Sequence, residues 1–443
     1  MTFSSADLLA SLQSLPVARA YWVAFSGGLD SHVLLHAMER LRDRLEAPLH
    51  AVHVHHGLQQ QADAWEAHCR SVCAELDVPL QVRHLDLQPA PGESVEAIAR
   101  DARYRAIGEL LGEQHMLLTA QHRDDQAETL LLQLLRGAGI EGLAAMPMCK
   151  QWGQGWHARP LLPVARADLH DYARRHRLQW VEDPSNLDIR FDRNYLRRQV
   201  MPVLQQRWPS AAATIARSAA HLAASLQTIA GQAAADLQTC LGSGQRLQIA
   251  ALLSLPEARR QATLRAWLRA EGQALPDQAR MQQIEYSVLR AGADAAPVVS
   301  WADIAVRAYR GELWLTRARL PEPPQRSLAW GDTRQLELPA GLGRLQRQAA
   351  GAGIPDRLWR EGRVSVRWRG GDASCRLPGR QGTRSFRKLC QELAIPGWRR
   401  PYLPLLYVDD SLAAVASYCV CGDWPCGSGE PCSSIQWDRP ELL

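Results

Sequence analysis

The chain of 443 residues is 46% hydrophobic, carries a formal net charge of +5 and contains ten cysteines. A chain of this length and apolar content can bury a sizeable core and is expected to form two or three domains. No run of about 18 apolar residues occurs, and the first residues lack a basic start followed by an apolar stretch, so we expect neither a membrane span nor a signal peptide and favour the cytoplasm. The cysteines lack a tight disulfide framework, so most are expected to be reduced and buried.

The first 160 residues alternate between strand-like and helix-like segments. Such alternation predicts a doubly wound α/β domain, in which helices cover both faces of a parallel sheet. In such sheets ligands bind beyond the carboxyl ends of the strands, so the residues that follow each strand are the first candidates for a site. Apolar runs predict strands at 21–25, 49–54, 80–85 and 116–120, and helical periodicity predicts helices at 33–45, 64–76, 95–111 and 127–135.

Beyond residue 166 the composition becomes helical and rich in arginine, with a loop expected at 180–193. Alanine-rich helical patterns at 211–271 and strand-like alternation at 295–317 predict a mostly helical α+β middle domain. The proline-rich stretch 321–325 is typical of a linker, and a small α+β domain is expected from about Gly353. We therefore predict domains at 1–208, 209–320 and 353–443.

A glycine turn follows the first expected strand and leads into a helix. Glycines let the backbone approach a phosphate, a helix N-terminus favours negative charge, and serine hydroxyls can donate to phosphate oxygens. An aspartate in the turn would repel phosphate unless a cation lay between them, so a bound Mg²⁺ is expected. An ordinary capped turn is the alternative, but six matching residues at this place in the topology favour a nucleotide site. These residues are Ser26, Gly27, Gly28, Leu29, Asp30 and Ser31.

This turn resembles the PP-loop of the N-type ATP pyrophosphatases, which split ATP between the α and β phosphates and adenylate a substrate. The resemblance implies that the six residues bind ATP. No GxxxxGK[ST] pattern occurs in the chain, and without the lysine of that pattern γ-phosphoryl transfer is the less natural chemistry.

A second polar cluster, which contains His122, Asp125 and Glu128, follows the fourth expected strand. The two acids are three residues apart, so both can project from the first turn of a helix toward the nucleotide. Alternatively, an Asp-x-x-Glu pair at a helix start only stabilises the helix end, and the two residues alone leave both interpretations open. His122 by itself is equally explained as a satisfied histidine at the end of a strand.

Together with further segments, this cluster resembles the tRNA(Ile)-lysidine synthases. The resemblance covers residues 20–208 well, is looser through the middle of the chain and returns near the C-terminus. An ordered series of this kind is far more specific than any single motif. Its members are HHG at 55–57, GES at 92–94, RDARY at 100–104, RPLL at 159–162, EDPSN at 182–186, RNYLR at 193–197, CRLPG at 375–379 and PLLY at 404–407.

The resemblance implies a reaction in two steps. The O2 of cytidine 34 in the CAU anticodon of tRNA(Ile) attacks the α-phosphate of ATP and releases pyrophosphate. The ε-amino group of free L-lysine then displaces AMP from C2, and the resulting lysidine lets the anticodon read AUA. The implied roles are catalysis by Asp30, His122, Asp125 and Glu128; ATP binding by residues 26–31 and His55; Mg²⁺ binding by Asp30 and Asp125; lysine binding by Asp125, Glu128 and Arg103; and tRNA binding by Arg193, Arg197, Arg376, Arg380, Arg384 and Lys388.

A basic segment lies near the C-terminus. Residues 357–400 contain twelve Arg or Lys against three acids, which leaves the rest of the chain slightly acidic. We interpret the arginines as a tRNA-facing surface, with a solvated basic face as the alternative. Tryptophans at 359, 368 and 398 interleave with these charges, and we expect them in the core.

Two groups of residues contain the side chains that zinc prefers. His53 and His55 share one face of the second strand while His56 faces away, so a zinc site is not expected there. The spacings of Cys419, Cys421, Cys426 and Cys432 lack C-x-x-C pairs, and zinc binding by these residues stays open.

Three other functions compete with lysidine formation. A tRNA thiolase usually needs paired cysteines, and the chain contains no C-x-x-C. A GMP or argininosuccinate synthetase would use the same loop but would not explain the basic C-terminal segment. A catalytically silent RNA-binding protein with the same fold is the rival from a different class.

Overall fold

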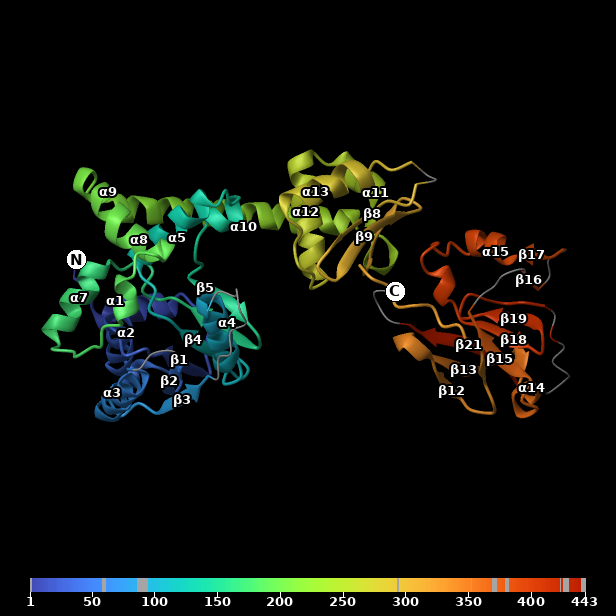
Figure 1. Ribbon diagram of the computed structural model, residues 1–443, viewed down its shortest axis with the longest axis horizontal. Coiled ribbons are helices and arrows are strands. Elements are labelled where there is room, and N and C mark those ends of the chain that lie inside the picture. Colours follow the sequence, from blue (N-terminus) through green and yellow to red (C-terminus); the bar gives the residue numbers. More distant parts are fainter. Residues whose placement is uncertain are drawn as a thin grey trace. The chain divides into compact units, whose positions relative to one another are not determined.

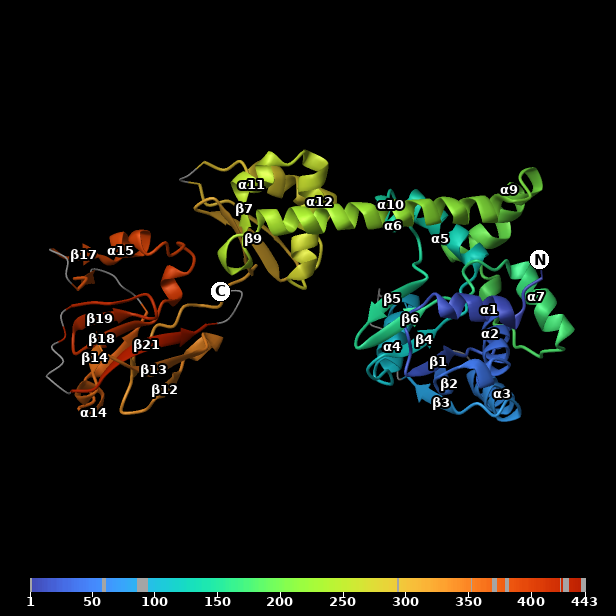
Figure 2. The ribbon, with the colours of Figure 1, turned by 180° about the vertical axis from the view of Figure 1, so that it is seen from behind.

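Two compact units make up the chain, Met1–Ile229 and Ala230–Leu443, coloured from blue to green and from green to red in Figures 1 and 2. The computed structural model describes residues 2–57, 61–85, 95–292, 295–351, 353–368, 373–378, 382–422, 424 and 430–439. The division between the units falls within the long helix α10 (Ala211–Cys240). Among the described residues, no helix is both long and apolar enough to cross a membrane.

A six-stranded sheet forms the centre of the first unit (Figure 1). Its strands are parallel except for the last, which pairs with its neighbour as an antiparallel hairpin at 149–158 that the sequence patterns had not indicated. The four expected parallel strands are confirmed to within a few residues. In spatial order the strands are β3 (Leu80–His84), β2 (Leu49–His55), β1 (Ala20–Ala24), β4 (His115–Leu118), β6 (Gly155–Ala158) and β5 (Cys149–Trp152).

Helices cover both faces of this sheet, so the predicted doubly wound α/β fold is confirmed. On one face Val23 packs with helices α1, α2, α3 and α7, and on the other Trp22 and Leu117 pack with Ile107 of α4. This alternation of side chains follows from the two-residue period of a strand. The helices are α1 (Ser5–Gln13), α2 (Leu29–Glu39), α3 (Ala62–Glu75), α4 (Val95–Gly108) and α7 (Arg166–Arg175).

A layer of shorter helices precedes α10 and packs on its first turns. Ala127 of α5, Met201 of α9 and Ala212 of α10 form a small apolar cluster, which joins two of the shorter helices to α10. The loop expected at 180–193 contains only the short 3₁₀ turn Pro184–Leu187 before the next helix begins. The elements of this layer are α5 (Arg123–Leu135), α6 (Ile140–Leu143), α8 (Asp192–Tyr195), the π-helical turn Leu196–Val200 and α9 (Met201–Arg207).

The second unit begins with helices and a four-stranded antiparallel sheet, as expected for an α+β middle domain. Trp267, Leu268 and Val306 belong to its hydrophobic core. Its helices are α11 (Ile249–Ser254), α12 (Glu257–Ala270) and α13 (Gln278–Gln283), continued by the π-helical turn Ile284–Val288. Its strands, in spatial order, are β7 (Leu247–Gln248), β10 (Glu312–Arg317), β9 (Ile304–Tyr309) and β8 (Val298–Trp301).

The C-terminal part of this unit contains two antiparallel sheets around one apolar core. Trp330, Leu345 and Trp359 are buried in that core, so strands that precede residue 353 pack with the strands that follow it. The first sheet consists of β11 (Leu328–Ala329), β15 (Val364–Arg367), β18 (Leu405–Val408), β19 (Ser411–Val415) and β20 (Cys419–Val420). The second consists of β12 (Gln335–Glu337), β13 (Arg344–Ala350), β21 (Cys432–Asp438) and β14 (Ile354–Pro355). The pair β16 (Ser374–Cys375) and β17 (Arg384–Ser385) and the helices α14 (Arg357–Arg360) and α15 (Phe386–Glu392) complete this part.

Candidate active site at the carboxyl ends of the strands

The glycine turn after β1 is a tight loop that leads into helix α2. Gly27 has a φ of +80°, and a Cβ atom there would lie 3.0 Å from Val181 Cγ2 and 3.1 Å from Cys69 Sγ. Only glycine fits both the backbone conformation and the space. Gly28 is the N-cap of α2, so the free N–H groups of the first helical turn begin at this loop.

Two serines brace the loop from within. The hydroxyl oxygens of Ser26 and Ser31 lie 3.0 Å apart, and the Ser31 hydroxyl donates to the Gly28 carbonyl at 2.9 Å. The Val181 N–H donates to the Gly27 carbonyl at 3.0 Å, which ties the 180–193 segment to the loop. The serines are therefore part of the scaffold that fixes the loop, and phosphate contacts by their hydroxyls stay a prediction.

Helix α5 begins at the neighbouring strand end with His122 as its N-cap. The His122 N–H donates to Asp125 Oδ2 at 3.1 Å, and the Asp125 N–H donates to His122 Nδ1 at 3.4 Å. This reciprocal pair of hydrogen bonds is a capping box, so Asp125 does stabilise the helix end, as the alternative interpretation of the acids expected. The capping partner is His122, however, and Glu128 takes no part in the box.

Asp30 of the loop lies next to this capping box. Its Oδ2 atom is 3.7 Å from His122 Nε2, which is in turn 3.3 Å from Asp125 Oδ2. Burial raises the pKa of the Asp30 carboxyl group, and the nearby Asp125 carboxylate adds to the rise while His122 opposes it. The structure therefore brings Asp30, His122 and Asp125 together on the same side of the sheet.

Arg197 joins Asp125 to Glu128. Its Nε donates to Glu128 Oε1 at 2.7 Å, and its Nη2 donates to Glu128 Oε2 at 2.9 Å and to Asp125 Oδ1 at 2.7 Å. Glu128 is 2% exposed, and burial raises the pKa of its carboxyl group although Arg197 lowers it. Sequence reasoning had assigned Arg197 to tRNA, and no signal in the sequence indicated that it would reach these acids.

Arg193 lies one helical turn before Arg197. Its Nη2 donates to the Thr129 hydroxyl at 2.9 Å, and its Nε is 3.9 Å from Glu128 Oε2. Both arginines of the RNYLR segment therefore face the α5 acids. Thr129 was not among the predicted site residues.

The histidines after β2 have partners of their own. His55 Nε2 is 2.9 Å from Asp63 Oδ1, and its ring packs against that of His84 with the centroids 4.8 Å apart. His56 accepts from Arg103 Nε at 3.1 Å, and burial followed by the charge of Arg103 lowers the pKa of His56 to about 4. The structure thus places Arg103 beside His56, and its predicted contact with lysine stays a prediction.

The predicted tRNA contacts of the second unit lie around β16, β17 and α15. Arg376 and Lys388 are exposed, and Arg384 is half-buried with its Nε donating to Glu392 Oε1 at 3.1 Å. Arg380 lies outside the described residues, as do the GES segment at 92–94 and Cys426.

The tryptophans of the basic segment lie in or against the core. Trp359 and Trp368 are buried, which confirms the prediction that they belong to the core, and Trp398 is partly buried against Tyr309 and Trp314.

Three segments of the chain match known protein families. Residues 3–204 match the family described as PP-loop domain, residues 247–314 the TilS substrate binding domain, and residues 364–437 the TilS substrate C-terminal domain. The tRNA(Ile)-lysidine synthase of Coxiella burnetii is 42% identical over 95% of this chain and 93% of its own length. That of Pseudomonas putida is 45% identical over 90% of this chain and 92% of its own length.

The chain belongs to the tRNA(Ile)-lysidine synthase family. Among solved structures, the U34-tRNA thiolase NcsA from Methanococcus maripaludis is similar with a TM-score of 0.42 and 15% identity, over 49% of this chain and 77% of that chain. A likeness this weak carries no argument about activity. Membership in the synthase family therefore rests on the sequence relatives and on the three matched segments.

Proposed function

We propose that this protein ligates free L-lysine to C2 of cytidine 34 in the CAU anticodon of tRNA(Ile), with ATP as the activating substrate. Its relatives are named tRNA(Ile)-lysidine synthases and match nearly its whole length. One observation carries the proposal. Asp30 of the glycine loop lies beside His122, which in turn lies beside Asp125, so the loop and the acids of α5 form one site. The cytoplasm, where tRNA and ATP meet, is the compartment we propose.

In the first step the loop binds the phosphates that leave. Its backbone N–H groups and the start of α2 favour negative charge at the point where pyrophosphate develops. The cytidine O2 attacks the α-phosphorus, and the bond to the bridging oxygen of pyrophosphate breaks. The rigid Gly27 turn, held by Val181, keeps the donors in place before the substrate arrives.

Mg²⁺ is the ion that Asp30 would hold. Asp30 Oδ1 is buried and has no hydrogen-bond partner, which fits a carboxylate oxygen that awaits a cation. Asp125 fits less simply, because its two oxygens already accept from His122 and Arg197. The ion would neutralise charge on the α and β phosphates.

In the second step Asp125 and Glu128 receive the lysine side chain. Lysine arrives mostly as an ammonium ion, with a reference pKa near 10.4, and must lose a proton before it attacks C2. Glu128 is suited to accept that proton, because burial raises the pKa of its carboxyl group. The incoming ammonium group competes with Arg197 for the same carboxylate oxygens. Arg197 is therefore proposed to act as the counter-ion of both acids until lysine binds.

The remaining predicted residues are assigned to substrate recognition. We assign Arg376, Arg384 and Lys388 to tRNA phosphates, in the predicted C-terminal domain at 353–443. Their exposed or half-buried positions are compatible with phosphate contacts. All residues assigned above to the two chemical steps lie in the predicted catalytic domain at 1–208, and we assign no chemical step to the predicted middle domain at 209–320.

The decisive assay combines the purified full chain with ATP, labelled lysine and a transcribed tRNA(Ile) that has a CAU anticodon. Transfer of label to the tRNA, together with repeated turnovers of pyrophosphate release, is expected only when all three substrates are present, because without lysine the reaction stops at the adenylated cytidine after one turnover. An Asp125→Asn variant should lose label transfer, whereas Glu109→Gln, an exposed change on the same unit, should keep it. Repeated turnovers of pyrophosphate release in the absence of lysine would overturn the proposal and favour a thiolase-like activity.

A further inference from the structure

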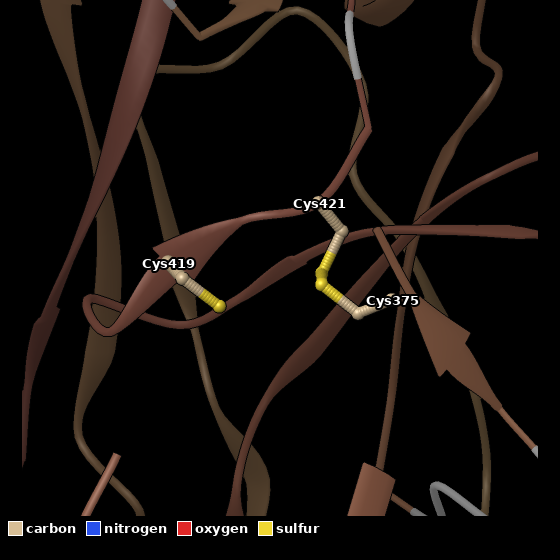
Figure 3. A group of neighbouring side chains, drawn as sticks. All are labelled: Cys375, Cys419 and Cys421. Atoms are coloured by element: carbon tan, nitrogen blue, oxygen red, sulfur yellow. A yellow bond between two sulfur atoms is a disulfide. The ribbon is translucent and has the colours of Figure 1, made fainter. Parts of the chain in front are cut away.

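Three cysteine side chains converge in the C-terminal part of the second unit (Figure 3). Cys375 ends β16, Cys419 begins β20, and Cys421 follows β20 directly. Their three sulfur atoms lie within 4.8 Å of one another. Cys375 and Cys421 are joined as a disulfide, and Cys419 is a free thiol beside it.

The backbone brings these sulfurs together independently of the disulfide. The Gly422 N–H donates to the Arg376 carbonyl at 2.5 Å, so the residues next to Cys421 and Cys375 are paired. The Cys421 N–H donates to the Ala413 carbonyl at 2.7 Å, and Cys419 pairs with Val415 in the β19–β20 register. Reduction of the disulfide would therefore leave three thiols still facing one another.

The surroundings of the cluster are apolar. Cys375 is 0% exposed and Cys421 is 1% exposed, both within the hydrophobic core, whereas Cys419 is partly exposed at its edge. Structural disulfides are rare in the cytoplasm, the compartment proposed above, so we expect Cys375 and Cys421 to be a pair of thiols there. A disulfide also needs only two cysteines and gives no reason for a third sulfur at the same point.

We propose that Cys375, Cys419 and Cys421 of the reduced protein form a binding site for one thiophilic cation such as Zn²⁺. Thiolates select soft or borderline ions of this class. Zinc binds sulfur at about 2.3 Å, which places tetrahedral ligands about 3.8 Å apart, so only small side-chain movements are needed. Cys419 lies at the partly exposed edge, which leaves a fourth position on the ion for water.

These three cysteines differ from the four C-terminal cysteines that the sequence suggested as zinc ligands. Cys419 and Cys421 belong to both sets, but Cys375 replaces the predicted partners, and within the described residues Cys432 does not join the cluster. The 46-residue separation between Cys375 and Cys421 hides their proximity in the sequence.

Loading the site requires a defined chemical change. The Cys375–Cys421 bond accepts two electrons and two protons from a thiol reductant of the glutathione class, which itself becomes a disulfide. The cation then displaces the protons of the three thiols and binds the thiolates. The ion would hold β16 and the chain after β20 together, as the disulfide does in the oxidised protein.

The test uses the full chain, reduced and kept free of oxygen and of bound metal, titrated with Co²⁺ and then with Zn²⁺. We expect one equivalent of Co²⁺ to give the charge-transfer absorption of cobalt thiolates, and Zn²⁺ to displace it. A Cys419→Ser variant should lose this absorption. The matched control is Cys240→Ser, which alters a buried free cysteine in another hydrophobic core of the same unit, and this variant should still bind one equivalent of Co²⁺.

Three outcomes would overturn the site. These are a reduced wild-type protein that binds no Co²⁺, a Cys419→Ser variant that binds as well as the wild type, and a Cys375–Cys421 disulfide that persists in thiol-trapped protein from freshly lysed cells. If Cys419→Ser fails to fold, alkylation of the three thiols in the wild type with and without Zn²⁺ gives the same answer, since bound metal should protect them. None of these readouts needs tRNA, lysine or ATP, so a failure of the proposed ligase activity would be recognised separately.

Discussion

The guanidinium group of Arg197 donates to both oxygens of the Glu128 carboxylate, at 2.7 and 2.9 Å. The same group reaches Asp125 Oδ1 at 2.7 Å, so one cation holds two buried acids. A lysine side chain at position 197 could not form the same set of hydrogen bonds, because all donors of an ammonium group lie on one nitrogen atom. Arg197 therefore orders the two acids, and the lysine binding proposed above requires Arg197 to give up part of these contacts.

Replacement of Arg197 by alanine should abolish most lysidine formation. The change removes the main counter-ion of two adjacent buried carboxylates and leaves Glu128 only the longer contact with Arg193, at a cost of about 3–5 kcal/mol to folding stability. One acid would take up a proton, and label transfer should fall by about 10²-fold or more. Arg197→Lys should recover only part of the loss, because lysine cannot bind both acids in the same geometry.

The control for this prediction is Arg198→Ala, which changes the exposed neighbour on the same turn. Label transfer from lysine to tRNA measures activity, and urea unfolding measures stability. Normal activity in Arg197→Ala would mean that the ion pairs are scaffolding without a part in the reaction.

Much of this site follows from local sequence. The Gly27 turn, its place after β1 and the helix behind it are local features, as is the His122 position at the next strand end. Parallel strands bring their carboxyl ends to one edge, so the proximity of Asp30 to Asp125 was predictable from topology alone. The capping box of His122 and Asp125 is also local. It was not predicted, because the usual N-cap residue of this motif is Ser or Thr and not His.

The parts that could not be predicted depend on distant segments. Arg197 reaches Glu128 across 69 positions, and only the packing of the short helices on α5 determines which of several arginines does so. The antiparallel hairpin β5–β6 was missed because its strands are four residues each and carry little periodicity. Cys375 and Cys421 are 46 positions apart, and only the packing of the elements between them brings the two side chains together.

Asp30→Asn should raise the concentration of Mg²⁺ that catalysis requires. The amide loses the negative charge that a cation needs, while its size and place in the loop are kept. Pyrophosphate release should fall by about 10²-fold at low Mg²⁺ and recover partly when Mg²⁺ is raised. The control is Asp43→Asn, an exposed acid of the same unit, and an unchanged Mg²⁺ titration in Asp30→Asn would exclude Asp30 as a ligand.

Removal of the exposed basic side chains Arg376 and Lys388 should weaken tRNA binding without changing the chemistry. Each lost phosphate contact should lower the slope of log K against log salt by about 1. The measurement is tRNA binding at several salt concentrations, with Arg344→Ala, a change on β13, as the control. A double variant with the wild-type slope would mean that these side chains form only a solvated basic face.

Protonation of His36 should destabilise the first unit as the pH falls. His36 hydrogen-bonds to the Tyr172 hydroxyl at 2.9 Å, and burial, followed by the charges of His176 and Arg40, lowers the pKa of His36 to about 4. In the unfolded chain the same group binds a proton near pH 6.5, so the unfolded state gains protons first as the pH drops. The contribution of His36 is therefore complete above about pH 6.5 and is lost as the pH falls toward 4.

His36→Gln, which can still bond to Tyr172, should remove this part of the pH dependence. Between pH 7.5 and 5.0 the wild-type protein should lose about 1 kcal/mol more unfolding free energy than the variant, after allowance for the partial exposure of His36. Urea titrations at the two pH values measure the difference, with His221→Gln, an exposed histidine on α10, as the control. If the variant and the wild type lose the same free energy, His36 must carry the same charge in the folded and unfolded states, and its buried neutral form would be ruled out.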